Sequence, residues 1–441
     1  MPLLRSPPGL LQALQAEADA ARVSTGRQIR ALQELFQRFT KERQALNKSP
    51  HYLDDPGLRL AYLRYHVPLN VARSTCALGA AVRAKPEIAD WNRVVDLGAG
   101  PGTSALATLS SWRSARSAEI LLTDRSRNAL QVGRRLLAAC ASAREYPNPV
   151  VHTKVERLPN LPEIREKSIV WMSMVLNELV GTARKRFDPG VLVRRLEAAI
   201  PAPSVLIIVE PALRIPSRRL LDVREHLIAS PKWRVLAPCT HAETCPLIEI
   251  RDRPWCHFHF DWHPGPWVDE VAKPLGLEAR HGALSYLVVE RVSPRESPRN
   301  ATTSPQAARV IGDHMHVRGK KGGGIYICTS GERELLENPP EDIGRGDVID
   351  FGESRESFEV RHRWSKKPVR RPTPPRRSAD ESDESAERPR SKSQRKKGAK
   401  RKTPRDESPE PRGKKSDKRG KKTAKRGKKK KATPKPSKHR K

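Results

Sequence analysis

The chain has no apolar run that approaches the roughly 20 residues a membrane helix needs, so we expect no membrane span. Cysteine is also scarce, at 6 of 441 residues, which does not fit a disulfide-rich secreted domain and favours a reducing, intracellular compartment. The first residues lack the apolar core and cleavage site of a signal peptide. A mitochondrial address stays open, although Glu17 and Asp19 count against it.

Acidic residues are few toward the C-terminus. Residues 361–441 contain 35 Lys and Arg against 9 Asp and Glu, and therefore carry 26 of the 35 net positive charges. Beyond Trp364 almost no apolar residue occurs, so burial cannot offset the entropy of ordering. We predict that this tail is disordered and binds nucleic-acid phosphates through counterion release. A tail that only solubilises the chain is the alternative.

The stretch R-V-V-D-L-G-A-G-P-G-T at 93–103 predicts a strand, a turn and the start of a helix. Gly98, Gly100 and Gly102 tolerate positive φ and let a ligand approach the backbone, while the first turn of a helix presents unpaired N–H groups. The spacing differs from the G-x-G-x-x-G of dinucleotide sites. With Asp96 before the first glycine, it is similar to the first motif of S-adenosylmethionine-dependent methyltransferases.

A second acid, Asp124, ends the next predicted strand at 120–123. A carboxylate there can accept hydrogen bonds from both ribose hydroxyls of a nucleoside cofactor. The resemblance to methyltransferases implies that Asp96 helps to hold the amino-acid end of S-adenosylmethionine. A plain glycine-rich turn is the simpler alternative, but the order of strand, turn, helix, strand and acid favours a cofactor site.

Predicted strands and helices alternate from Trp91 onward, which indicates a parallel sheet with helices on both faces. We expect an α/β, Rossmann-like methyltransferase fold over residues 91–295, with the cysteine-rich stretch as an insertion. A helical region at 1–90 precedes it, and a small β module at 305–355 follows. The predicted strands of the sheet are 94–97, 120–123, 150–154, 168–174 and 205–209.

The sequence does not identify a catalytic residue. Amino-methyltransferases usually carry Asn or Asp followed by Pro-Pro-aromatic after the fourth strand, whereas this chain has V-L-N-E-L, where Asn177 could supply only part of that hydrogen bonding. Pro238 and Cys239 resemble the Pro-Cys of cytosine-5 methyltransferases but follow the fifth predicted strand instead of the fourth. Whether a methyl group is transferred therefore stays open.

Three cysteines, Cys239, Cys245 and Cys256, lie in a loop-like stretch rich in proline and aromatics, and Cys328 lies far downstream. Four thiolates can close a tetrahedral zinc site or hold a four-iron cluster. Core thiols without a metal are the plainer alternative. If Cys328 is a ligand, the metal ties the β module to the sheet domain. Rival ligands for zinc are His241, His257 and His259.

The glycine turn, P-C-T-H…C-P-L and W-C-H-F together resemble the methyltransferase-like protein 17 family, small-ribosomal-subunit proteins of mitochondria with bacterial relatives. The resemblance covers roughly residues 50–352. It implies a [4Fe-4S] cluster on the four cysteines, with zinc as the runner-up, and S-adenosylmethionine binding in a fold whose transfer activity is in question. It also implies a role on small-subunit rRNA in assembly or translation. The location would be a bacterial-type cytoplasm or, alternatively, the mitochondrial matrix.

Two other functions are compatible with the same features. An active rRNA methyltransferase would use the same cofactor site, and a general nucleic-acid-binding protein would act through the basic tail. In either case we expect no membrane partner, and off the ribosome we expect a monomer.

Overall fold

The computed structural model describes residues 3–42, 51–112, 118–176, 178–179, 187–250, 254–277, 280–293, 307–317, 323–351, 357–361 and 369–372. Residues 1–376 form one compact unit. The second unit, 377–441, lies outside the described residues and holds most of the tail that we predict to be disordered. None of the described helices combines the length and apolar character needed to span a bilayer.

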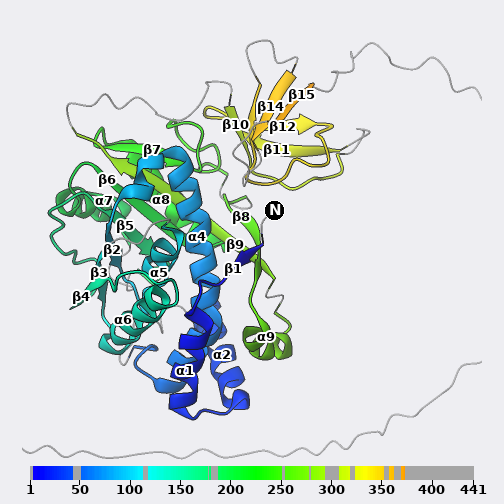
Figure 1. The fold of residues 1–441 in the computed structure, drawn as a ribbon. Coiled ribbons are helices and arrows are strands. Elements are labelled where there is room, and N and C mark those ends of the chain that lie inside the picture. The colour runs from blue at the N-terminus through cyan, green and yellow to red at the C-terminus, as the bar shows by residue number, and fades with distance from the viewer. Residues whose placement is uncertain are drawn as a thin grey trace, which may run out of the picture. The chain divides into compact units, whose positions relative to one another are not determined.

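A nine-stranded sheet forms the centre of the unit (Figure 1). Five of its strands pair in parallel, and they coincide with the five strands expected from the sequence. All five residues of β5 are buried, as in a parallel strand that helices cover on both faces. The Rossmann-like α/β class is thereby confirmed. In spatial order the parallel strands are β4 (Val150–Val155), β3 (Glu119–Asp124), β2 (Arg93–Leu97), β5 (Ile169–Ser173) and β6 (Ser204–Pro211).

The other strands of this sheet lie beyond β6 and pair mainly in an antiparallel sense. The longest, β9, pairs with β6, β7 and β8, and the short β1 then adds to β8 in parallel. A strand at the N-terminus was not expected, since the sequence there reads as helical. The bounds are β1 (Leu4–Arg5), β7 (Trp233–Ala237), β8 (Phe258–His263) and β9 (His281–Arg291).

Two apolar cores cover the two faces of the sheet, because successive strand residues point to opposite sides. Val94 belongs to the first core and its neighbour Val95 to the second. The first core is completed by α4 (Val67–Ala84), α5 (Thr103–Ser111) and α6 (Arg127–Ser142) together with the N-terminal helices. The second is completed by α7 (Pro189–Ala199) and α8 (Arg214–Ile228).

The N-terminal region is helical, as predicted, and its helix α3 continues into α4. Asp55 caps α3, since its Oδ1 accepts a hydrogen bond from the Leu58 N–H at 2.8 Å, and Pro56 occupies the first helical position. A π-helical turn at Tyr62–His66 joins α3 to α4. The remaining helices are α1 (Leu10–Ala21), α2 (Thr25–Thr40), α3 (Pro56–Ala61), α9 (Pro266–Ala272) and the 3₁₀ turns Pro86–Asp90 and Lys273–Leu275.

The β module is a six-stranded antiparallel sheet with its own small core around Ile325, Ile327 and Ile349. It continues beyond residue 355, where we placed its end. Its last strand lies inside the segment predicted to be disordered, so regular structure extends to Pro372. The strands are β10 (Ala307–Val310), β11 (Gly324–Cys328), β12 (Arg333–Glu337), β13 (Val348–Asp350), β14 (Ser357–Arg361) and β15 (Val369–Pro372).

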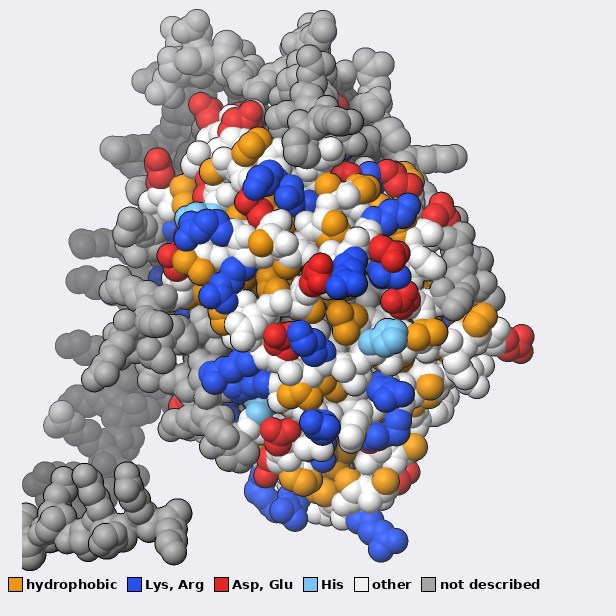
Figure 2. All heavy atoms as spheres, turned by 90° about the vertical axis from the view of Figure 1, so that its left-hand side faces the viewer, with side chains coloured by type: hydrophobic (Ala, Val, Ile, Leu, Met, Phe, Trp, Pro, Cys, Tyr) orange, Lys and Arg blue, Asp and Glu red, His pale blue; other side chains and the backbone are white. Residues whose placement is uncertain are grey.

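Charges of both signs mix on the surface of the described body. On the face drawn in Figure 2, Lys and Arg side chains alternate with Asp and Glu. Some of them pair, as Arg135 does with Glu17 across 2.5 Å. This face therefore differs from residues 361–441, in which basic residues dominate the sequence.

Candidate cofactor site and cysteine cluster

The glycine turn follows β2 at the point where the order of the parallel strands reverses, the usual place for a ligand in such sheets. Gly98, Gly100 and Gly102 have φ angles of 72°, 51° and 76°, which L side chains rarely adopt. A Cβ at Gly98 would also lie 2.4 Å from Val175 Cγ1. The turn therefore needs glycine for its backbone at all three positions, and at Gly98 for space as well.

Asp124 ties this turn to the end of β3. Its Oδ2 accepts a hydrogen bond from the Gly100 N–H at 2.9 Å, and its Oδ1 accepts one from the Ser126 N–H at 2.8 Å. Burial raises the pKa of the carboxyl. Asp124, Gly98 and Gly100 all line the same pocket, so the structure brings these three predicted residues together.

Asp96 and Gly102 lie behind this pocket and do not line it. The Asp96 side chain is 1% exposed, and its Oδ2 accepts a hydrogen bond from the Ala105 N–H in the first turn of α5 at 3.2 Å. Within the described part of the chain, its Oδ1 has no hydrogen-bond partner. Burial, with a contribution from the Asp124 charge, raises its pKa to about 7. Asp96 thus anchors the helix that follows the turn.

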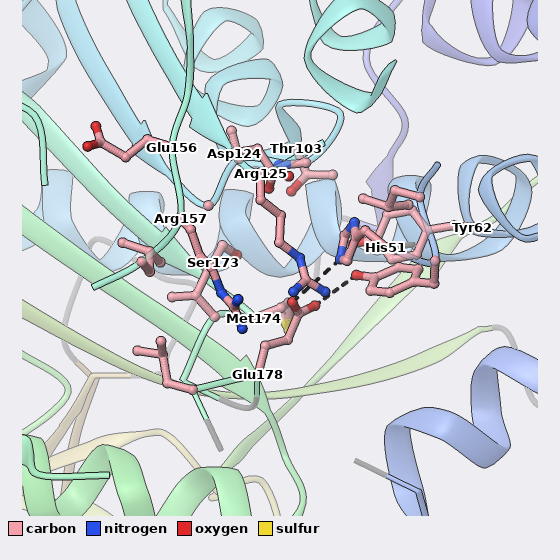
Figure 3. A pocket seen from close by; sticks show the side chains of 18 residues that line it. His51, Tyr62, Thr103, Asp124, Arg125, Glu156, Arg157, Ser173, Met174 and Glu178 are labelled. Atoms are coloured by element: carbon pink, nitrogen blue, oxygen red, sulfur yellow. Dashed lines mark hydrogen bonds and ion pairs between the residues drawn. The ribbon is translucent and has the colours of Figure 1, made fainter. Parts of the chain in front are cut away.

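Sequence reasoning missed the opposite wall of the pocket. In Figure 3, Thr103 and Asp124 lie at one end, Glu178 lies at the other, and Arg125 extends between them. Glu178 Oε1 accepts a hydrogen bond from the Tyr52 hydroxyl at 2.8 Å, across 126 residues of sequence. Its position directly after β5 was the available signal. Asn177, beside it, lies outside the described residues.

The open volume of this pocket is about 70 Å³. Small-molecule pockets are usually larger, about 300 Å³ or more. A second cavity adjoins it, however, and the two share Tyr52, Tyr62, Met174 and Glu178 as walls. The space at this edge of the sheet therefore consists of two adjoining pockets with a common wall.

The four predicted metal ligands also come together. Cys245 and Cys328 share a small buried core with Leu221 and Ile311, and Cys256 packs against it. Burial and then the neighbouring thiols raise the pKa of Cys245 to about 11, and the same causes raise the pKa values of Cys256 and Cys328. Cys239 contributes to each of these shifts, so the four thiols are close enough to influence one another's ionisation.

Arg224 of α8 holds the loop that carries these cysteines, and no sequence pattern marks it. Its side chain is 2% exposed and donates from Nε to Cys239 Sγ at 3.2 Å. It also donates to the backbone carbonyls of His241 and Glu243 at 3.2 and 2.9 Å. From the other side, Arg309 of β10 donates to the Pro238 carbonyl at 2.7 Å. These bonds hold the loop against both α8 and the β module.

The rival zinc ligands occupy different positions. His241 Nε2 lies 3.3 Å from Cys328 Sγ, whereas His257 packs between Trp255 and His259. Burial lowers the pKa of His257 to about 4. In the described ranges, no three Cys, His, Asp or Glu side chains are placed as ligands of one metal ion. The structure thus gathers the thiols without arranging them around a single ion.

Comparison with known proteins decides the family. The model of the family described as "Mitochondrial small ribosomal subunit Rsm22" matches residues 58–336, more than half of the chain. The chain belongs to this family. The matched span of this Rsm22-family protein contains the glycine turn, Asp124 and all four clustered cysteines. The resemblance to mitochondrial small-subunit proteins is confirmed at this level, and the family's name fits the mitochondrial alternative for location.

Other comparisons add little. No curated protein matched the chain. Similar solved structures include an S-adenosylmethionine-dependent O-methyltransferase from Thermotoga maritima (12% identity, TM-score 0.28, 50% of this chain and 67% of that one). Another is a putative RNA methyltransferase from Pyrococcus horikoshii (12%, 0.29, 59% and 98%). A third is an O-methyltransferase family protein from Burkholderia thailandensis (15%, 0.30, 61% and 72%). At these values the likenesses bear on neither cofactor nor substrate.

Proposed function

We propose that this Rsm22-family protein is an S-adenosylmethionine-binding factor that acts on the rRNA of the small ribosomal subunit, in assembly or translation. One observation carries the cofactor: three glycines with positive φ, joined to the Asp124 carboxylate, at the point where the strand order reverses. The family match supports the ribosomal partner. Membership in the methyltransferase-like protein 17 family is the narrower form of this proposal.

Each residue of the cofactor site has a defined task in this proposal. Asp124 accepts hydrogen bonds from the ribose hydroxyls, and Gly98 and Gly100 let the cofactor lie against bare backbone. Asp96 does not line the pocket and acts indirectly, because its hydrogen bond fixes the first turn of α5. Bound S-adenosylmethionine supplies an electrophilic methyl group on sulfur. Whether this methyl is transferred is a separate matter from binding.

We further infer that Cys239, Cys245, Cys256 and Cys328 hold a [4Fe-4S] cluster, with zinc as the runner-up. Burial and the neighbouring thiols raise the pKa values of Cys245, Cys256 and Cys328, so added positive charge would favour their ionisation. A metal centre supplies that charge, since coordinating thiols lose their protons. The donor set therefore fits a thiolate-bound centre in its chemistry.

Calorimetric titration of the full chain with S-adenosylmethionine tests the cofactor site. Gly100→Ala should weaken binding by about tenfold or more, because φ at this position is 51° and the turn lines the pocket. Gly276→Ala is the matched control, since φ there is 65° and an added Cβ would meet nothing within 4 Å. Equal affinities for the two variants, or no binding by the wild type, would refute the site.

Protein purified without oxygen tests the cluster. We expect a brown preparation that contains iron and inorganic sulfide, and Cys256→Ser should lose both. Cys140→Ser is the control, because Cys140 is buried in α6, away from the four clustered thiols, and burial raises its pKa to about 12. A folded, colourless, iron-free wild type would contradict the cluster, and zinc in that protein would favour the runner-up.

Sedimentation with purified small subunits separates the ribosomal role from general binding by the tail. A chain that ends at Arg376 keeps the compact unit and loses residues 377–441. We expect it still to sediment with the subunits, more weakly because it lacks phosphate contacts. Complete loss of binding would favour a general nucleic-acid-binding protein.

A further inference from the structure

The second cavity has a volume of about 280 Å³ and lies beside the proposed cofactor site. We call it the aromatic pocket, because six of its lining residues carry aromatic rings. Helix α2 supplies two of them, the π-helical turn supplies three, and Tyr52 supplies the sixth. The rings are Phe36, Phe39, Tyr52, Tyr62, Tyr65 and His66.

The π-helical turn shapes this wall. A π turn is rare and frequently marks a functional site, because an α-helical turn would bring a different set of side chains to the same side. Here Tyr62 and His66 stack with centroids 5.2 Å apart and an interplanar angle of 28°. Phe39 and Tyr65 meet the His66 ring edge to face, each at 5.2 Å. His66 is therefore held in one orientation by its neighbours.

His66 carries a polar atom that its own surroundings do not satisfy. The residue is 7% exposed, and among the described residues its Nε2 has no hydrogen-bond partner. Burial, with a contribution from Arg73, lowers its pKa to about 3, so the imidazole is neutral. A buried polar atom without a partner destabilises a fold. The His66 ring lines the cavity, whereas its Nε2 lies beneath the surface of the wall.

The pocket also contains polar groups in fixed positions. Asn70 donates to the Tyr62 hydroxyl at 3.1 Å and accepts from Arg73 at 2.8 Å. Arg73 in turn donates to the Ala283 carbonyl at 2.9 Å, and Glu178 holds the Tyr52 hydroxyl. Flat rings beside such groups suit a heteroaromatic ligand, which stacks with its faces and forms hydrogen bonds with its edge.

We propose that the aromatic pocket binds a single unstacked nucleobase of RNA beside the cofactor. The inference rests on the proposed function, since it takes the RNA from the ribosomal partner and the neighbouring site from S-adenosylmethionine. It concerns binding of the base and holds whether or not a methyl group is transferred. Enzymes and binding proteins that read RNA bases commonly take them out of the stack into pockets of this composition.

Ultraviolet crosslinking of the full chain on purified small subunits tests this pocket, because irradiation joins a base directly to a ring stacked on it. Mass spectrometry of the digested protein should find nucleotide adducts on the peptides that contain Phe36, Tyr62 or Tyr65. Saturating S-adenosylmethionine should leave these adducts in place. Loss of the adducts with cofactor would put the base in the cofactor site and overturn the proposal.

A histidine substitution adds a control for structure. His66→Ala removes one ring from the wall of the pocket, and should reduce the adducts about threefold to tenfold. His152→Ala, at an exposed position of the edge strand β4, should leave them unchanged. Sedimentation with subunits but adducts only outside the aromatic pocket overturns the inference alone. Failure to sediment at all overturns the proposed function with it.

Discussion

Replacing Asp96 by Asn should change how the stability of the protein depends on pH. Burial and the nearby Asp124 charge raise the pKa of Asp96 in the folded chain to about 7. The hydrogen bond from the Ala105 N–H acts in the opposite direction, because it favours the carboxylate. In the unfolded chain the carboxyl ionises near its ordinary value of 3.8. Between these values the folded chain binds one more proton than the unfolded chain. The free energy of unfolding therefore falls as pH rises from about 4 to about 7.

The magnitude follows from the two pKa values. They differ by about 3, and a difference of one in pKa corresponds to about 1.4 kcal/mol. Ionisation of Asp96 therefore lowers the free energy of unfolding by at most about 4 kcal/mol. Asp96→Asn has no proton to lose. The free energy of unfolding of the variant relative to the wild type should therefore increase by up to that amount between about pH 4 and pH 8. Titrating groups that do not interact with Asp96 are common to both proteins and cancel, whereas Asp124 does interact with it.

Urea unfolding of both proteins, followed by tryptophan fluorescence in the same salt, measures this difference. Asp19→Asn is the control, since Asp19 is exposed on α1 and its substitution should give an offset that does not grow with pH. A constant offset for Asp96→Asn as well would mean that Asp96 titrates normally in the folded chain. The description of Asp96 as a buried carboxyl with only one of its two oxygens hydrogen-bonded would then be wrong.

Three further substitutions have expected effects on stability. His66→Phe should raise the free energy of unfolding by about 1 kcal/mol, because it removes a buried nitrogen without a partner, and a decrease in urea unfolding would count against an unsatisfied atom. Arg224→Met should lower the free energy of unfolding by about 3 kcal/mol or more, because two backbone carbonyls and Cys239 lose their donor. A melting temperature unchanged from the wild type would contradict this. Gly282→Ala should cost about 2 kcal/mol or more in the same melts, because its Cβ would lie 2.1 Å from Phe260 Cζ, and a neutral result would mean that the ring moves freely.

The parallel strands β2, β5 and β6 could be predicted because they are buried on both faces and so appear in the sequence as short, continuous apolar runs. The glycine turn was predictable for a related reason, since positive φ restricts the residue type at each position. Strands β12 and β15 were not predictable. R-E-L-L-E and V-R-R-P have little apolar alternation, and their place in the sheet comes from backbone pairing with β11 and β14.

The candidate site was predictable only where a local pattern marks it. Gly98, Gly100 and Asp124 belong to such a pattern and do line the pocket. Glu178 acquires its role from Tyr52, 126 residues away, and no local signal records that contact. His66 lies in an apolar helical run where an ordinary core residue is the natural interpretation. Its distinctive feature, an unpartnered nitrogen among rings, exists only once distant segments have packed.

Strand β9 connects the aromatic pocket with the cysteine cluster. The Ala283 carbonyl accepts from Arg73 at the pocket, and two residues along the strand the Ser285 hydroxyl donates to the Cys256 carbonyl at 2.6 Å. This link runs through the Cys256 backbone, so loss of the Ser285 hydroxyl breaks it whether or not a metal is bound. Cys245 has a different anchor, since its N–H donates to Glu225 at 3.2 Å.

Comparison of two variants separates these effects. If the pocket depends on β9 and not on the metal, Ser285→Ala should reduce the base adducts, because it loses the hydrogen bond to the Cys256 carbonyl. Cys245→Ser should then remove the metal and leave the adducts intact. Equal loss of adducts in both variants would instead show that the metal itself maintains the pocket, and iron and adducts are measured on the same preparations.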